Sequence, residues 1–544
     1  DYAEAHFNRG NALYALKQHE DAISSYRQAL STDPDYAKAH SALSQSTRQI
    51  CEWSSYLETE RELGERVREG RGVVDPFMFL SFSDAPKDQH RCAELYVGDR
   101  IGSGVEAVAQ KVSRDEGRIR VAYVSADFHT HATAYLIAEL LELHDRDRFE
   151  IIAISFGPDD RSQMRRRLVR SFDQFVEVRE RSDRAVAETI ADLQCHIAVD
   201  LKGYTKDGRL GIFAHRPAPV QVNYLGYPGS MGADFIDYII VDPFVVPPDQ
   251  QENFTERLVH LPECYQVNDR KRQIAKQTPT REELGLPEKG FVFCCFNNTY
   301  KITPDIFDIW MRLLGSVPGS VLWLMGSNDS VQDNLRREAS ARGVTPDRLV
   351  FAPNVKLTSH LARHRAADLF LDTLPYNAHT TASDALWAGL PVLTCTGKAF
   401  AGRVAGSLLH AVGSSELVTE SLEDYEALAL ELAGKPELLS GIKEKLLANR
   451  DTAPLFDTDR FCRDLEAAYT RMVDTWRAGG MPEAFAVGVT RAPRRRRRQR
   501  PGGKTASGGR QLLEAAKLLQ ADQPAQAETV NGGAKWGQSA VLEG

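Results

Sequence analysis

Residues 369–397 read LFLDTLPYNAHTTASDALWAGLPVLTCTG: an apolar run, a polar loop, a run with helical spacing and a second apolar run. Short apolar runs that alternate with helical segments predict βαβ units, whose strands form a parallel sheet. Ligands of such sheets bind beyond the carboxyl ends of the strands. This stretch therefore predicts an α/β fold, and it places a binding site in the loop that follows Leu374.

The same alternation extends over most of the chain in two series, which start near residue 118 and near residue 291. Two doubly wound sheets in tandem predict two Rossmann-like lobes with a cleft between them. We look for the chemistry in that cleft. The runs that we expect to be strands are 118–127, 149–157, 196–203, 220–226 and 235–242 in the first series, and 291–298, 320–327, 348–353, 369–374 and 390–397 in the second.

The start of the chain repeats itself, because DYAEAH at 1–6 returns as DYAKAH at 35–40. An offset of 34 residues matches the tetratricopeptide repeat, a helix-turn-helix unit. The second copy loses the pattern after Leu43, and about three units are needed for a stable stack. We therefore expect this segment to end a longer array or to dock on the α/β part of the chain. The residues that suit the repeat in the first copy are Gly10, Ala22, Tyr26, Ala29 and Pro34.

Composition narrows the choice of partners and compartment. The chain has 67 Lys plus Arg against 75 Asp plus Glu, a net charge of −8, which gives no general attraction to nucleic acid or acidic membranes. No apolar stretch approaches the ~18 residues of a membrane span, and the chain does not start with a signal peptide. The eight cysteines are scattered, mostly in apolar runs, and include no CxxC. We expect reduced core cysteines and a cytoplasmic protein without membrane or nucleic-acid partners.

The composition of the chain changes after about residue 478. RAPRRRRRQRPGGKTASGG at 491–509 is basic, rich in glycine and without apolar periodicity, which predicts a flexible segment. Electrostatic contact with RNA or an acidic protein is the alternative. The following RQLLEAAKLLQADQPAQAE at 510–528 is helix-like, and it could dock on the body or on another copy of the chain, so an oligomer stays open.

Three polar loops follow strands of the second series. They contain a cation, amides and the start of a helix, which are groups that hold a diphosphate, and a carboxylate that can accept from ribose hydroxyls. Each group alone is accounted for by a helix cap, a salt bridge or a solvated side chain. Together, at one edge of one sheet, they predict a nucleotide-diphosphate site. They are Asn297, Asn298 and Lys301 in the first loop, His360, Arg363 and His364 in the second, and Thr380, Thr381 and Asp384 in the third.

Several of these stretches resemble the protein O-GlcNAc transferases and their SPINDLY relatives, and we expect a bacterial member. The resemblance covers about residues 1–475 and implies tetratricopeptide repeats followed by a two-lobed GT-B glycosyltransferase region. The stretches that carry it are NNTYKI, LDTLPYNAHTTASDALWAGLPVLT and RVAGSLL in the second half, and VSADFHTHATAYL, GYTKDGR and FAHRPAPVQVNYLGYPGSMGADFIDYIIVD in the first.

The resemblance also implies roles for single residues. Lys301 is similar to the lysine that neutralises the diphosphate leaving group, and His131 to the histidine on the acceptor side of the reacting carbon. A phosphate oxygen or a water relay is the alternative base. The family also has a lysine beside the ribose, and it matches either Lys356 or no residue near that position. The other implied contacts are Asn298 beside Lys301, His360 and Arg363 around the uracil, Asp384 at the ribose, His379, Thr380 and Thr381 at the phosphates and sugar, and the backbone of Leu225 and Gly226 at the sugar hydroxyls.

By resemblance, the reaction is an inverting, metal-independent transfer of GlcNAc from UDP-GlcNAc to Ser or Thr hydroxyls, without any cofactor. Protein or peptide acceptors would reach the cleft through the repeats. Tyr376 resembles a residue of SPINDLY-type sequences, so another UDP-hexose or GDP-fucose is an alternative donor. A catalytically weak scaffold is the rival class. We set aside two DxD triplets at 145–147 and 457–459, and GGKT at 502–505, as chance matches.

These inferences divide the chain into five segments. They are the end of a repeat array at 1–48, a helical linker at 49–116, an N-terminal catalytic lobe at 117–285, a C-terminal lobe that binds the nucleotide sugar at 286–478, and a basic, flexible tail with a helix-like part at 479–544.

Overall fold

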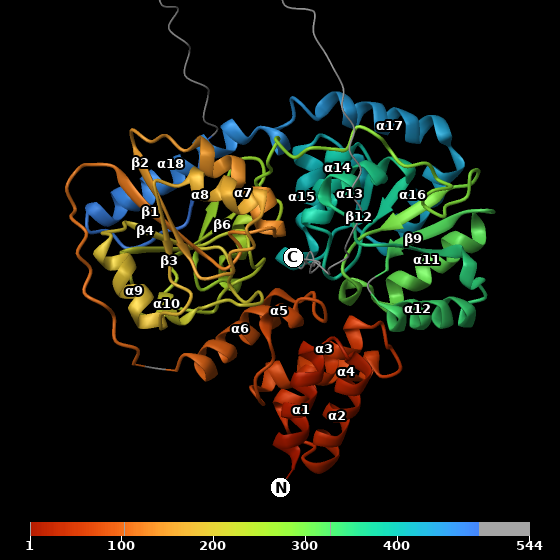
Figure 1. The fold of residues 1–544 in the computed structure, drawn as a ribbon, viewed down its shortest axis with the longest axis horizontal. Coiled ribbons are helices and arrows are strands. Elements are labelled where there is room, and N and C mark those ends of the chain that lie inside the picture. Colours follow the sequence, from red (N-terminus) through yellow and green to blue (C-terminus); the bar gives the residue numbers. More distant parts are fainter. Residues whose placement is uncertain (1, 103, 327, 489–544) are drawn as a thin grey trace, which may run out of the picture. The chain divides into compact units, whose positions relative to one another are not determined.

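Helices precede the first strand in the computed structural model, which describes residues 2–102, 104–326 and 328–488 (Figure 1). The first two form the predicted antiparallel hairpin, and a Cβ added at Gly10 would lie 2.3 Å from the ring of Tyr26. The helices cross so closely that the position requires glycine. This confirms the repeat. The helices are α1 (Ala3–Ala15), α2 (His19–Thr32), α3 (Ala37–Gln49), α4 (Tyr56–Glu69), α5 (Pro76–Phe79) and α6 (Pro86–Arg100).

The first sheet is parallel throughout, with the order β14-β7-β6-β5-β4-β1-β2-β3. Alternate residues of β1 pack against α7, α8 and the last long helix, α18 (Thr458–Arg477), on one face and against α6, α9 and α10 on the other. The strands are β1 (Ile119–Ser125), β2 (Phe149–Ser155), β3 (Gln174–Glu177), β4 (Ile197–Asp200), β5 (Val220–Asn223), β6 (Tyr238–Val241), β7 (Arg257–His260) and β14 (Phe485–Ala486). The intervening helices are α7 (Ala132–Leu143), α8 (Gln163–Ser171), α9 (Asp183–Asp192) and α10 (Gly211–Ala214).

The second sheet is also parallel, with the order β10-β9-β8-β11-β12-β13. Its strands are β8 (Val292–Cys295), β9 (Val321–Met325), β10 (Leu349–Ala352), β11 (Leu369–Leu371), β12 (Val392–Cys395) and β13 (Val418–Thr419). Its helices are α11 (Pro304–Ser316), α12 (Asp329–Ala341), α13 (Leu357–Arg363), α14 (Thr380–Ala388), α15 (Val404–Ala411), α16 (Leu422–Gly434) and α17 (Pro436–Asn449). Two Rossmann-like lobes behind a helical repeat segment confirm the predicted fold class.

Short 3₁₀ helices occur in the loops between these elements. The one that matters for the site is η2 (Thr299–Lys301), directly after β8. The others are η1 (Pro248–Asn253), η3 (Pro346–Arg348), η4 (His364–Ala366), η5 (Phe400–Gly402), η6 (Ser415–Leu417) and η7 (Pro454–Phe456).

The last long helix, α18 (Thr458–Arg477), departs from the predicted segmentation. We assigned it to the C-terminal lobe by its place in the chain, but Leu465, Tyr469 and Met472 are buried in the core of the first lobe, against β1 and α7 (Figure 1). Its apolar stripe matches the face of the first sheet that α7 leaves uncovered. Strand β14 then pairs with β7 of the same sheet.

Side chains also join the two lobes directly. Asp242, at the end of β6, is buried and accepts a hydrogen bond from Ser407 of α15 at 2.7 Å. The ring of Phe244 lies so close to Gly406 that an added Cβ would be 2.4 Å from it. Nε of Arg403 donates to the carbonyl oxygen of Phe244 at 2.8 Å. These contacts join the segment after β6 in the first lobe to α15 in the second.

Candidate active site

The order of the second sheet reverses between β8 and β11, which is where ligands of such sheets bind. Asn297 follows β8, and Asp372 and Thr373 follow β11. The amide of Asn297 donates to the Thr373 hydroxyl at 2.8 Å and to Asp372 Oδ1 at 3.3 Å. The loops after the two strands therefore form one polar floor.

Lys301 lies on this floor and is 3% exposed. Its ammonium donates to the carbonyl oxygen of Asn377 at 2.9 Å and lies 3.7 Å from the centre of the Tyr376 ring. Burial lowers the pKa of Lys301 to about 7, although the negative charge of Asp372 opposes this shift. Within the described residues the ammonium makes no ion pair. An anionic ligand would supply the missing negative charge.

Asp372 holds the loop around this lysine. Its Oδ1 accepts from the backbone N–H of Thr373 at 2.7 Å and of Ala378 at 2.6 Å, and its Oδ2 accepts from the Thr394 hydroxyl at 2.7 Å. Burial raises the pKa of Asp372 to about 6. Our reading of the sequence missed this residue. Its signal was a carboxylate placed directly after a buried strand.

The third predicted loop meets the first at the start of α14. This helix begins at Thr380, as its sequence predicted, and its N-cap residue is His379. Nε2 of His379 donates to the carbonyl oxygen of Ala401 at 3.1 Å, and its ring centre lies 5.0 Å from that of Tyr376. The Thr381 hydroxyl donates to Asn297. Lys301, Asn297 and the start of α14 thus form one continuous cluster.

His360 and Arg363 form a second pair beyond the ends of β8 and β10. Nη1 of Arg363 donates to the carbonyl oxygen of Pro353 at 2.6 Å, and Nη2 donates to Nδ1 of His360. The guanidinium lies over the Phe296 ring at 4.8 Å. Burial lowers the pKa of Arg363 to about 10 and that of His360 well below its usual value. This pair offers planar, polar groups suited to a nucleobase.

His364 and Lys356, which the sequence also suggested in the second loop, do not belong to this pair. His364 is fully buried and donates through Nδ1 to the carbonyl oxygen of His360 at 2.7 Å, so its task is packing. Lys356 is exposed at the N-cap of α13.

Asp384 lies one turn into α14, and its carboxylate has a partner within the chain. It forms a buried ion pair with Arg272, which comes from the connection between the lobes. The side chains are 8% and 1% exposed. Burial raises the pKa of Asp384 to about 6, and Arg272 opposes the shift. The sequence reading assigned Asp384 a ribose contact and missed Arg272, which is 112 residues away.

His131 caps α7 at the switch point of the first sheet, between β1 and β4. Its Nδ1 accepts from the N–H of Thr133 at 3.2 Å and lies 3.4 Å from Asp127. Both oxygens of Asp127 accept from the ammonium of Lys202 at 2.9 Å, in a buried pair. Asp127 and Lys202 were not among the predicted site residues, although each lies at the end of a run predicted to be a strand and just after the observed strand, β1 or β4.

One residue links the two switch points. Tyr135 lies one turn after His131 on α7, and burial, together with the charges of Asp160 and Asp384, raises its pKa. The start of α7 in the first lobe is therefore near α14 in the second. This brings the predicted acceptor-side histidine to the same region as the cluster around Lys301.

The loop after β5 presents its backbone. Leu225 has a φ of 72°, in the left-handed region that a leucine rarely adopts. A Cβ on Gly226 would lie 2.1 Å from the carbonyl oxygen of Leu201. The chain passes so close here that only glycine fits, and such strain is typical of functional loops.

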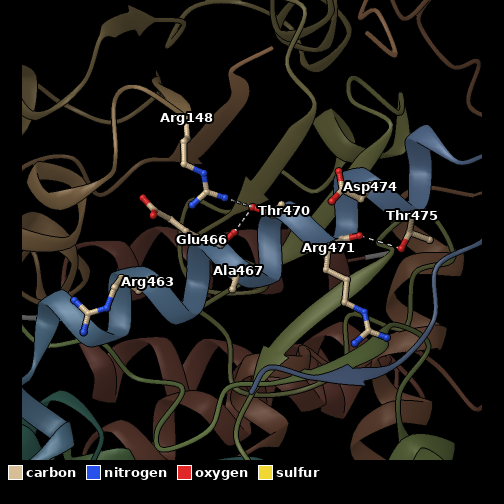
Figure 2. Close-up of a pocket in the computed structure, with 8 residues that line it drawn as sticks. All are labelled: Arg148, Arg463, Glu466, Ala467, Thr470, Arg471, Asp474 and Thr475. Atoms are coloured by element: carbon tan, nitrogen blue, oxygen red, sulfur yellow. Dashed lines mark hydrogen bonds between the residues drawn. The ribbon is translucent and has the colours of Figure 1, made fainter. Parts of the chain in front are cut away.

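The features that we set aside lie elsewhere. Asp457 caps α18 by accepting from the N–H of Arg460 at 3.0 Å, and GGKT lies outside the described residues. Figure 2 shows a pocket along α18 that includes Arg148, Arg463 and Thr470 but none of the predicted site residues. Among the helices of residues 2–102, 104–326 and 328–488, none is both long and apolar enough to cross a membrane.

The chain matches known proteins over most of its length. A family model for glycosyl transferase family 41 matches residues 103–278 and 271–465, and a tetratricopeptide repeat model matches residues 3–36. A solved structure of a Thermobaculum terrenum O-GlcNAc transferase mutant is 28% identical, has a TM-score of 0.74, and the match covers 88% of this chain and 92% of that one.

Two curated relatives agree with this match. The Arabidopsis thaliana probable UDP-N-acetylglucosamine–peptide N-acetylglucosaminyltransferase SEC is 37% identical over 422 residues, which cover 76% of this chain and 43% of the relative. The Caenorhabditis elegans UDP-N-acetylglucosamine–peptide N-acetylglucosaminyltransferase is 27% identical over 570 residues, which cover 82% and 49%. The chain thus spans less than half the length of these relatives. With two lobes, a repeat and a family model that covers both lobes, the chain belongs to glycosyl transferase family 41.

Proposed function

We propose that this protein is an inverting glycosyltransferase that transfers GlcNAc from UDP-GlcNAc to Ser or Thr hydroxyls of proteins without a metal ion. One observation carries the proposal: the buried ammonium of Lys301 lies without a counter-ion among the described residues at the sheet's switch point, beside the start of α14. The names of the relatives supply the donor and the acceptor.

Charge develops on the diphosphate as the bond to the sugar breaks. Lys301 and the free N–H groups at the start of α14 are preorganised to stabilise that charge. A donor of this kind is worth roughly 2.7–4 kcal/mol in the transition state. In this arrangement the protein itself supplies the positive charge that stabilises the departing diphosphate. On the same sheet edge, His360 and Arg363 would hold the uracil.

The acceptor hydroxyl would enter from the first lobe. His131 lies on that side, and its Nδ1 lies 3.4 Å from Asp127. Because the Thr133 N–H donates to Nδ1, a neutral His131 in this conformation carries its proton on Nε2. It would then donate toward the cleft. A phosphate oxygen or a water is therefore the better proton acceptor, and His131 orients the hydroxyl.

Protein acceptors would bind along the repeat segment and the cleft. All eight cysteines are buried and free, which suits a reducing compartment, so we place the reaction in the cytoplasm. For the donor sugar there is a second candidate. The stretch around Tyr376 resembles that of SPINDLY-type sequences, and relatives named SPINDLY are 30–32% identical to this chain. GDP-fucose is therefore the second candidate donor.

A panel of UDP-GlcNAc, UDP-glucose, UDP-galactose and GDP-fucose, scored by release of the nucleoside diphosphate, tests the proposal. UDP-GlcNAc should give the fastest release, and an acceptor protein should gain the mass of one GlcNAc per site. Lys301→Met should reduce release by at least about 100-fold. Lys398→Met is the control, because Lys398 is exposed. Preference for GDP-fucose would overturn the donor, and full activity of Lys301→Met would overturn the site.

A further inference from the structure

The end of the repeat segment forms hydrogen bonds with the turn that carries Lys301. Nε of Arg48, near the end of α3, donates to the carbonyl oxygen of Tyr300 at 3.0 Å. The hydroxyl of Thr299 donates to the carbonyl oxygen of Gln49 at 2.7 Å. Both contacts fall on η2, on the two residues directly before the lysine. They join segments that are about 250 residues apart in the chain, so no local pattern requires them.

The guanidinium of Arg48 is costly where it lies. It is 2% exposed and makes no ion pair with any described residue. Besides Tyr300 it donates to the carbonyl oxygen of Ser81, and it stacks 4.9 Å from the Tyr56 ring centre and 4.6 Å from that of Phe82. Burial raises the pKa of the Glu60 carboxyl and the nearby charge of Arg48 opposes this shift, but Glu60 makes no ion pair with Arg48. A buried charge without a carboxylate in direct contact is expensive, and a methionine would fill this space at a lower cost. The charge therefore has a use other than packing.

The segment that follows α3 is itself fixed on the second lobe. The amide of Asn334, on α12, donates to the carbonyl oxygen of Ile50 at 2.8 Å. Sγ of the buried Cys51 lies 3.6 Å from the carbonyl oxygen of Thr299 and donates to it. The ring of Trp53 packs against Phe307 with its centre 5.3 Å away. The backbone next to Arg48 is therefore held by the second lobe, so that its side chain can keep the turn in place.

The linker segment also contacts this turn. The ring of Phe77, in α5, lies 6.2 Å from that of Tyr300 and 6.1 Å from that of Tyr376, centre to centre. Tyr376 is the ring over which the Lys301 ammonium lies. The backbone of the turn and the aromatic partner of the lysine are thus both held by residues that precede the catalytic lobes.

We propose that Arg48 is a positioning residue for Lys301, and that the end of the repeat segment is therefore part of the donor site. This inference rests on the function proposed above, and it extends the task of the repeats from acceptor binding to leaving-group departure. Arg48 acts through the Tyr300 carbonyl and does not touch the donor. A displacement of about 1 Å at a catalytic group can cost 10²-fold in rate.

A double-mutant cycle tests the proposal. Arg48→Met should lower kcat for UDP release by roughly 10–100-fold and leave KM for UDP-GlcNAc nearly unchanged. In the Lys301→Met background the same change should have almost no further effect, because the residue acts only through the lysine. Arg48→Lys keeps a donor and should restore part of the rate. Equal losses in both backgrounds would overturn the proposal, because they would indicate a general structural role.

Amide hydrogen exchange tests the same geometry without any activity. In Arg48→Met, the peptide that covers residues 296–303 should exchange faster, and peptides from β9 and β10 should not. Arg66→Met is the matched control: Arg66 is also buried in the helical segment, but it pairs with Glu62 on its own helix. Unchanged exchange at 296–303 would overturn the proposal. If the unaltered protein binds and releases no nucleotide, the proposed function fails, and exchange alone decides whether Arg48 holds the turn.

Discussion

The ammonium of Lys301 lies 3.7 Å from the centre of the Tyr376 ring, and both groups are buried. A cation on an aromatic face away from water gains about 2 kcal/mol or more. The ring thus compensates part of the cost of burying the ammonium and fixes its place. Tyr376 therefore matters first as the partner of the lysine, whichever sugar the site accepts.

Removal of this ring should lower the rate. Tyr376→Phe keeps the aromatic face and should release UDP within about twofold of the unaltered rate. Tyr376→Leu should lose about 2 kcal/mol of this interaction, which corresponds to about 30-fold in kcat. UDP release at saturating donor measures both. Equal rates for the two variants would show that the ring does not support the lysine.

The affinity for UDP should depend on pH through Lys301. Burial holds the pKa of its ammonium near 7 in the unliganded protein, and a bound diphosphate raises it. The contribution of the ammonium is then complete below about pH 7 and is lost as pH rises through the bound-state pKa, by up to about tenfold per unit. Calorimetry in two buffers should show proton uptake on binding at pH 8.

Neighbouring groups set the controls for this pH dependence. Asp372 and His379 are the titratable groups whose charges interact with the lysine. The phosphate of UDP changes its charge below the range of pH 7 to 9 in which the effect of Lys301 is expected. Lys301→Met should therefore remove the pH dependence between 7 and 9 and leave any change below pH 6. An unaltered protein whose affinity stays constant from pH 7 to 9 would contradict the assigned shift.

Asp384→Asn should destabilise the protein even without a ligand. The change leaves the buried guanidinium of Arg272 without a charged partner, which costs about 3–5 kcal/mol. The midpoint of denaturant unfolding measures the effect. Asp384→Leu combined with Arg272→Met removes both charges and should recover much of the loss. A stable Asp384→Asn that only loses UDP affinity would restore the ribose contact that the sequence suggested.

Gly226→Ala should disturb the loop after β5. The added Cβ would overlap the carbonyl oxygen of Leu201, which is backbone and cannot turn aside. We expect a loss of about 1–3 kcal/mol in unfolding free energy and a larger loss of activity. Gly441→Ala, in α17, is the control, because nothing lies near its Cβ and alanine favours a helix. Equal behaviour of the two variants would remove the backbone of this loop from the site.

The sequence predicted the buried strands well, because continuous apolar runs between helical segments rarely form anything but the strands of a parallel sheet. It did not reveal β3, whose QFVE at 174–177 is partly exposed, the two-residue strands β13 and β14, or the four-residue β7. All but β7 are edge strands, and at an edge half of the backbone faces away from the sheet. Their pairing depends on the tertiary structure that brings them to the sheet.

The site was predictable in so far as it consists of loops after strands. Lys301, Thr381 and Asn297 come together because the carboxyl ends of parallel strands share one edge. The partner of Asp384 was not predictable, since Arg272 lies in the connection between the lobes and no local spacing relates the two residues. The same holds for the contact of Arg48 with Tyr300.

The place of α18 has a consequence for how the chain matures. The first lobe completes its core only with Leu465 and Tyr469, which are synthesised after every strand of the second lobe. During translation, the face of the amino-terminal sheet that carries α7 and α8 therefore stays incompletely covered while about 200 further residues leave the ribosome. In a gene cut between the lobes, α18 would belong to the second half, so the first half would lack the helix that completes its core.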